Sequence, residues 1–201
     1  WSFTKVATAT NGFMVDTKQL NTTLSISEKS VSEKYTGDHK KLLFAQCGAA
    51  VWEISKELRS KNLSLKTSGA SNGQTIAGLI STGAHGSTVD FGAAQEFVVG
   101  LHLIVSPTRH IWLEKKSFQV VSDSFIQKLN TELVQDDDLF NSALVSFGSF
   151  GIINGVLVEA EDLYLLETYM RKLPYDAKLK EAMNTLNFDG LDLPYGGERP
   201  F

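Results

Sequence analysis

The chain of 201 residues lacks several features that would point to particular classes of protein. It has one cysteine, Cys47, which excludes a framework of internal disulfides. No apolar run approaches the roughly 20 residues of a membrane-spanning helix, so we expect no membrane span. The net charge of -4 gives no electrostatic reason to expect nucleic acid as a partner. The composition is otherwise that of an ordinary soluble globular protein.

Candidate ligating and nucleophilic residues are sparse. The four histidines are scattered without metal-ligand spacing, so we predict no metal site. Three consecutive acids, Asp136 to Asp138, stand where a helix is expected to begin, and we favour capping of its first turn over a metal site. Cys47 lies in an apolar, strand-like run, and we interpret it as a buried thiol. The absence of a signal-peptide pattern at Trp1 slightly favours the cytoplasm, but the location stays open.

The hydrophobic pattern mixes strands and helices without strict alternation, which favours an α+β fold. The predicted strands are a pair within 12–26, then 41–49, 96–107, 110–116 and 151–160, with 96–107 and 110–116 forming a hairpin. The predicted helices are 51–62, 123–134 and 136–147, and the segment after residue 161 is helical in character with a break at Pro174.

The most unusual stretch is SGASNGQTIAGLISTGAHGSTVDFG, residues 68–92, which contains six glycines and neither Lys nor Arg. Glycine tolerates positive φ and lets other groups approach the backbone closely. Successive free N–H groups can form a nest for an anion. The stretch matches neither the P-loop nor the Rossmann fingerprint. From chemistry alone, a phosphate-bearing cofactor and a set of tight turns are equally favoured.

The residue order within this stretch is more specific. QTIAGLISTGAHGS, residues 74–87, resembles the second flavin loop of the vanillyl-alcohol oxidase / p-cresol methylhydroxylase superfamily. Residues 1–21, 45–65 and 139–159 resemble further segments of that superfamily in the same order. The similarity covers about residues 1–161 and is greatest to the aldonolactone, alditol and sterol oxidase branch.

This resemblance implies a fold, a cofactor and a set of site residues. The fold would be a p-cresol methylhydroxylase-type FAD-binding domain of two α+β subdomains over 1–161, with a substrate (cap) domain beginning at 162–201. FAD is the implied cofactor, and a small molecule is the implied substrate. For His85 we favour a role in holding the loop over acid–base chemistry. The residues implied to contact FAD are Ser2, Gly69, Thr75, Gly78, Thr82, Gly83, His85, Gly86, Ser87, Ile152 and Ile153.

Two departures from the superfamily pattern qualify this resemblance. Its first flavin loop usually has a histidine, often joined covalently to the flavin, where this chain has Trp1, so we expect non-covalent FAD. The glycines of that loop would lie before residue 1. The cap region, which carries the catalytic bases, would continue after residue 201. We therefore expect the sequence to be part of a longer polypeptide, and the catalytic residues stay unassigned.

The resemblance also implies an activity. The flavin would take a hydride from a C–H bond that carries an alcohol or lactol oxygen, in a sugar lactone, polyol or sterol-like substrate. Gly69, aligned over the edge of the isoalloxazine, favours oxygen as the electron acceptor. A dehydrogenase with another acceptor and a non-catalytic binding module derived from a flavoprotein are the alternatives.

Overall fold

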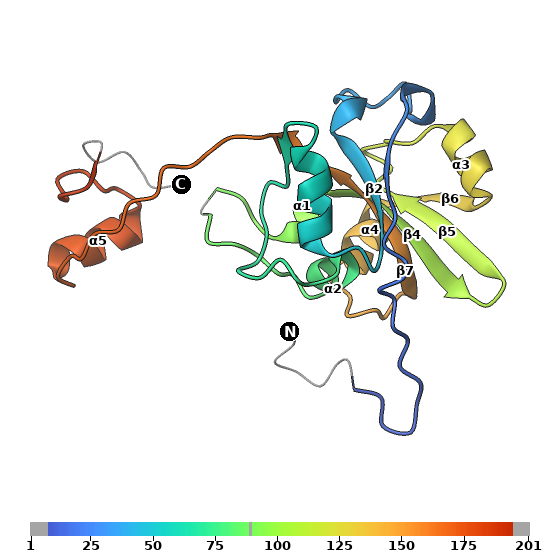
Figure 1. The fold of residues 1–201 in the computed structure, drawn as a ribbon, viewed down its shortest axis with the longest axis horizontal. Coiled ribbons are helices and arrows are strands. Elements are labelled where there is room, and N and C mark those ends of the chain that lie inside the picture. The colour runs from blue at the N-terminus through green and yellow to red at the C-terminus, as the bar shows by residue number, and fades with distance from the viewer. Residues whose placement is uncertain (1–7, 89, 195–201) are drawn as a thin grey trace. The chain divides into compact units, whose positions relative to one another are not determined.

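A computed structural model describes residues 8–88 and 90–194 (Figure 1). Contacts divide the chain into two units, Trp1–Leu163 and Tyr164–Phe201. The larger unit is built on a six-stranded sheet of order β1-β2-β7-β4-β5-β6. Adjacent strands are antiparallel except β5 and β6, which are parallel. This mixture of strands and helices confirms the predicted α+β class. The strands are β1 (Thr23–Ser25), β2 (Leu42–Gln46), β4 (Val98–Ser106), β5 (Arg109–Glu114), β6 (Glu132–Gln135) and β7 (Ile152–Glu159).

Three helices pack with one face of this sheet to form the larger core. They are α1 (Val51–Arg59), α2 (Ile76–Ser81) and α4 (Asp137–Leu144). In α1 the predicted apolar positions Val51, Ile54 and Leu58 are all buried. Burial of these side chains stabilises a helix that would be marginal in isolation. The predicted hairpin of β4 and β5 is also present, with Leu103 opposite Ile111.

The other face of the sheet carries a smaller core around Trp112. Helix α3 (Asp123–Leu129) covers it, with the Phe125 ring edge-on to Trp112 at a centroid distance of 4.7 Å. Two further strands, β3 (Leu63–Ser64) and β8 (Glu161–Asp162), form a separate antiparallel pair. Short 3-10 turns are found at η2 (Glu28–Ser30), η3 (His39–Lys41) and η4 (Ala94–Phe97).

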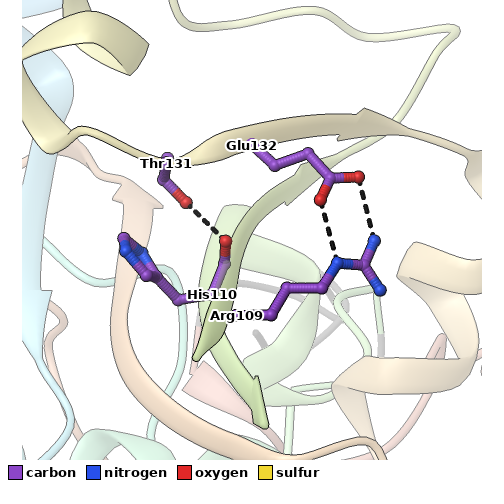
Figure 2. Close-up of polar contacts among 4 residues, drawn as sticks. All are labelled: Arg109, His110, Thr131 and Glu132. Carbon is purple, nitrogen blue, oxygen red and sulfur yellow. Dashed lines mark hydrogen bonds and ion pairs between the residues drawn. The ribbon is translucent and has the colours of Figure 1, made fainter. Parts of the chain in front are cut away.

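The helix predicted over 123–134 is shorter in the structure, where α3 spans Asp123–Leu129. It ends at Leu129 because Asn130 adopts a left-handed conformation with φ 51°, and β6 follows. Figure 2 shows how β6 is held beside β5: Arg109 donates two hydrogen bonds of 2.9 Å to the Glu132 carboxylate. In the same view, the Thr131 hydroxyl donates to the carbonyl of His110 at 3.0 Å. Tertiary pairing therefore overrides the helical spacing of the apolar residues.

Two other predicted elements differ from the structure. Of the strand pair within 12–26, only Thr23–Ser25 is a strand, because residues 13–16 pair with no neighbour in the described chain. After residue 161 the helical segment is limited to α5 (Ala177–Thr185), and residues 163–176 are irregular. Leu165 and Met170 there are 91% and 97% exposed. A helix with no buried face is only weakly stable. That residues 162–201 begin a substrate domain stays a prediction.

Candidate functional site

A groove of about 390 Å³ lies where α2 meets the start of β7. It brings together five of the residues predicted to contact FAD, although the glycine stretch and β7 are far apart in the sequence. They are Thr75, Gly78, Thr82, Ile152 and Ile153. None of the described residues that line this groove is charged. A ligand bound here would be held by neutral hydrogen-bonding groups and apolar contacts.

The glycine stretch contains a short helix as well as turns. Thr75 caps α2, with its hydroxyl oxygen accepting from the Gly78 amide at 3.4 Å. The start of α2 is tied to the turn between β2 and α1 because the Ile76 amide donates to the carbonyl of Ala49 at 2.8 Å. At the other end, the Thr82 hydroxyl donates to the Gly78 carbonyl at 2.9 Å. These contacts fix the Thr75 and Thr82 side chains at the two ends of α2.

Gly83 follows α2 in a left-handed conformation, with φ +64°. A Cβ atom at this position would lie 3.3 Å from Cγ1 of Val145. Both the backbone angle and the nearby side chain therefore favour glycine here. Gly83 does not line the groove itself, but it turns the chain directly beside it.

The opposite wall of the groove is a turn between α4 and β7. Phe147, Gly148 and Gly151 in this turn all have positive φ, at 52°, 80° and 130°. The Phe147 amide donates to the carbonyl of Ser81 at 3.2 Å, which joins this turn to the end of α2. Ile152, the first residue of β7, leaves 57% of its surface exposed at the groove. An apolar side chain held open beside a cleft is available for a flat ligand.

Sequence reasoning missed part of this lining. Thr17, Cys47, Phe147, Gly148 and Gly151 all line the groove and were not predicted as site residues. The repeated SFG of residues 146–151, between a predicted helix and strand, was a usable signal for a special turn. Thr17 had no such signal, because only tertiary packing brings it to Cys47. The Cys47 thiol is buried, as predicted, and burial raises its pKa.

Other predicted residues lie away from this groove. A Cβ atom on Gly86 would come within 2.8 Å of the Thr67 hydroxyl, so this glycine allows the two ends of the stretch to pack together. His85 is exposed, and its Nδ1–H donates to the carbonyl of Gly86 at 2.7 Å. That bond and the bridge of His85 to Ala93 favour a loop-holding role. Ser87 is exposed in the same loop. The predicted site residue Ser2, like Trp1, falls outside the described residues.

Gly69 lies next to a buried acceptor with no partner. The Gln74 oxygen Oε1 is buried and receives no hydrogen bond from the described part of the chain. A Cβ atom on Gly69 would be 3.5 Å from that oxygen. A buried acceptor of this kind costs free energy unless a ligand or water donates to it. The N–H group of an isoalloxazine ring is a donor of the required kind. The unpaired oxygen, the hydroxyls and the glycine backbone together fit FAD.

The histidines and the buried acid of the sheet form separate clusters. His102 Nε2 and His110 Nδ1 are 2.9 Å apart, and the Asn154 amide lies 2.9 Å from His102 Nδ1. Glu114, the last residue of β5, is fully buried. None of these residues lines the groove, so no role in its chemistry is assigned to them. Asp136 caps α4 by accepting from the Leu139 amide at 2.8 Å, which confirms the predicted capping role.

The described residues contain no group of three or more His, Cys, Asp or Glu side chains that could hold a metal ion. Within 8–88 and 90–194, no helix combines the length and apolar character needed to cross a membrane.

Several known proteins are similar to this chain. D-arabinono-1,4-lactone oxidase of Debaryomyces hansenii is 26% identical over 138 residues, which are 69% of this chain and 22% of that protein. L-gulonolactone oxidase 3 of Arabidopsis thaliana is 30% identical over 122 residues, covering 60% of this chain and 19% of that protein. The chain thus spans about a fifth of the length of these curated relatives.

Solved structures share the fold. Cholesterol oxidase of B. sterolicum superposes with a TM-score of 0.57 at 17% identity, over 80% of this chain and 28% of that one. 6-Hydroxy-D-nicotine oxidase of Arthrobacter nicotinovorans gives 0.55 at 16% identity, over 78% and 28%. These likenesses confirm the predicted fold. A family model described as an FAD binding domain matches residues 2–113, which is more than half of the chain and confirms the predicted cofactor. The chain belongs to this family of FAD binding domains.

Proposed function

We propose that this chain is part of an FAD-dependent oxidoreductase that oxidises a C–H bond carrying an alcohol or lactol oxygen, with oxygen as the acceptor. A sugar lactone is the favoured small-molecule substrate. The observation that supports this most directly is the similarity over two thirds of the chain to D-arabinono-1,4-lactone oxidase. L-gulonolactone oxidase 3 supports the same class of substrate.

The chain's own residues would hold and orient the cofactor. Thr75, Gly78 and Thr82 at α2 would face its polar groups through hydroxyls and backbone, while Ile152 and Ile153 would contact it from β7. FAD, when bound, supplies the hydride acceptor. Gly83, His85, Gly86 and Ser87 would shape the adjoining loop rather than react. Because the groove lining contributes no charge, close approach of the backbone carries the interaction.

Gly69 is the position through which we propose that the acceptor is selected. Oxygen has to reach the reduced ring, and a methyl group at a narrow entrance can block its path. The space around Gly69 would accept a Cβ atom, since the nearest neighbours are 3.5 Å and 4.0 Å away. The chain therefore tolerates alanine there, and glycine is not required by packing.

The test is reduction of the FAD-loaded full-length protein under anaerobic conditions. D-arabinono-1,4-lactone is expected to bleach the flavin absorbance, and air should then restore it with release of hydrogen peroxide. A polyol and a sterol serve as alternative donors. Bleaching that air does not reverse would identify a dehydrogenase with another acceptor. A flavin that no donor bleaches would support a non-catalytic module and contradict the proposal.

A further inference from the structure

A second pocket, of about 260 Å³, lies between the end of α1, strand β3 and the first part of the glycine stretch. It shares no lining residue with the groove at α2. Leu63, Leu65 and Leu163 form its apolar part. Its polar part consists of six side chains: Ser55, Arg59, Ser64, Thr67, Ser68 and Asn72.

The sequence places these groups together by simple geometry. Ser55 and Arg59 are four residues apart on α1, so they occupy the same face of the helix. Asn72 is held beside the start of α1 because its carbonyl accepts from the Trp52 amide at 3.0 Å. Thr67 is buried next to Gly86, so the later part of the glycine stretch also lies beside this pocket.

Most of these polar groups have no partner among the described residues. Among the described residues, the Arg59 guanidinium makes no ion pair, and the side chains of Ser55, Ser64, Thr67 and Asn72 make no hydrogen bond. Only the Ser68 hydroxyl is engaged, in a long contact of 3.3 Å to the carbonyl of Gly69. One guanidinium, several hydroxyls and an amide are thus all available to a ligand.

The charge that lines the pocket is positive, since Arg59 is its charged lining residue. No carboxylate lines it among the described residues. On the adjoining elements, Glu57 pairs with Lys61 at 2.7 Å and Asp162 pairs with Lys41 at 2.8 Å. Glu161 lies opposite Ser64 in the β3–β8 ladder and does not line the pocket. The planar guanidinium of Arg59 is exposed to a ligand, and together with the neighbouring hydroxyl donors it suits an oxyanion with several acceptor oxygens.

We propose that this pocket binds a phosphate-type oxyanion, either free or as the phosphate of a small organic ester, at a site separate from FAD. Arg59 is the charged anchor, and the hydroxyls of Ser55, Ser64 and Thr67 with the Asn72 amide complete the donor set. The pocket adjoins Gly69 through Ser68, so its ligand would sit next to the stretch that is proposed to hold the flavin.

The experiment is calorimetric titration of the full-length protein, with and without saturating FAD, using sodium phosphate, glycerol 3-phosphate and, at matched ionic strength, sodium chloride. Saturable one-to-one binding of phosphate but not chloride is expected in both FAD states. Tighter binding of glycerol 3-phosphate would indicate an ester as the ligand, and equal or weaker binding would indicate free phosphate. Arg59→Gln should weaken binding by about tenfold or more, since it removes a charge-assisted hydrogen bond.

Lys56→Gln is the matched control, because it removes the same charge from an exposed position of the same helix outside the pocket. It should leave the phosphate affinity unchanged. Ser55→Ala, which keeps the charge, should weaken binding by a smaller factor. The proposal is overturned by absence of saturable phosphate binding, by equal losses in Arg59→Gln and Lys56→Gln, or by loss of the site when FAD is added. Thermal melting of each variant shows that the fold is retained.

Discussion

Two polar regions on the same sheet are organised in opposite ways. Around Glu114 the polar groups are closed: the fully buried carboxylate accepts from Trp112 Nε1, from the amides of Val120 and Val121, and from Gln135 Nε2, at 2.8 to 3.2 Å. At the α2 groove the polar groups are neutral and accessible, and the nearby Gln74 oxygen receives no hydrogen bond from the described residues. Polar groups that satisfy each other stabilise the fold, whereas unsatisfied ones are available to a ligand.

The strongest test of the open region is Gly83→Val in the full-length protein. We expect loss of FAD binding by at least about 100-fold, because a β-branched residue is strained at φ +64° and would press on Val145 beside the groove. FAD titration followed by flavin fluorescence measures the affinity. Gly12→Val, an exposed glycine away from the groove, is the control and should bind normally. Normal binding by Gly83→Val would refute the proposed role of this loop. If Gly83→Val unfolds, Gly83→Ala provides the gentler test.

The strongest test of the closed region is Glu114→Ala. Removing the carboxylate leaves buried donors without an acceptor, so we expect the free energy of unfolding to fall by about 3 kcal/mol. Urea denaturation measures this change. Glu33→Ala, at an exposed acid, should change stability by less than about 0.5 kcal/mol. The folded fraction of Glu114→Ala should keep its FAD affinity. A specific loss of FAD affinity would show that the two regions are coupled.

Much of the larger core was predictable because local signals agree with tertiary structure there. The apolar spacing of α1 and the turn between β4 and β5 both predicted the observed elements. The failures occurred where partners decide the outcome. Residues 132–135 form a strand because they pair with β5, and residues 163–176 have no packed face that would hold a helix. Neither fact can be obtained from spacing alone.

The candidate site was predictable only in its chemically distinctive half. The order of residues in TIAG and TGAHG identified the α2 side, whereas the wall at Phe147 and Gly148 depends on backbone angles that sequence spacing does not specify. The Arg59 pocket was not predicted at all. Its donors come from a helix, a strand and a loop, and only the fold shows that they share one space.

A smaller effect is expected from Gly69→Ala, which tests how far the open region controls the acceptor. The methyl group fits without a clash, so flavin content should be kept. Reoxidation of the reduced flavin by oxygen should slow by about tenfold, equivalent to roughly 1.4 kcal/mol in the barrier. Stopped-flow mixing of reduced wild type and variant with oxygenated buffer measures the two rates. Equal rates, or a wild type already inert to oxygen, would count against the oxidase assignment.

The smallest expected effect comes from a second closed cluster, His102 with His110 and Asn154. Burial, and secondarily the charge of His110, lower the pKa of His102 from 6.5 to about 4. The unfolded chain therefore takes up a proton before the folded one as the pH falls. The stability that this supplies is fully present above pH 6.5, is lost progressively between 6.5 and 4, and changes no further below that.

Lowering the pH from 7 to 6 should therefore cost roughly 0.7 kcal/mol of unfolding free energy through His102. Urea denaturation at the two pH values measures the difference. His102→Gln should reduce this pH dependence, and His39→Gln, at a partly exposed histidine, should preserve it. An unchanged pH dependence in His102→Gln would mean that the cluster is open to water. His102 would then be accessible to water like the groups of the groove, and the contrast between closed and open regions would have to be redrawn on this face of the sheet.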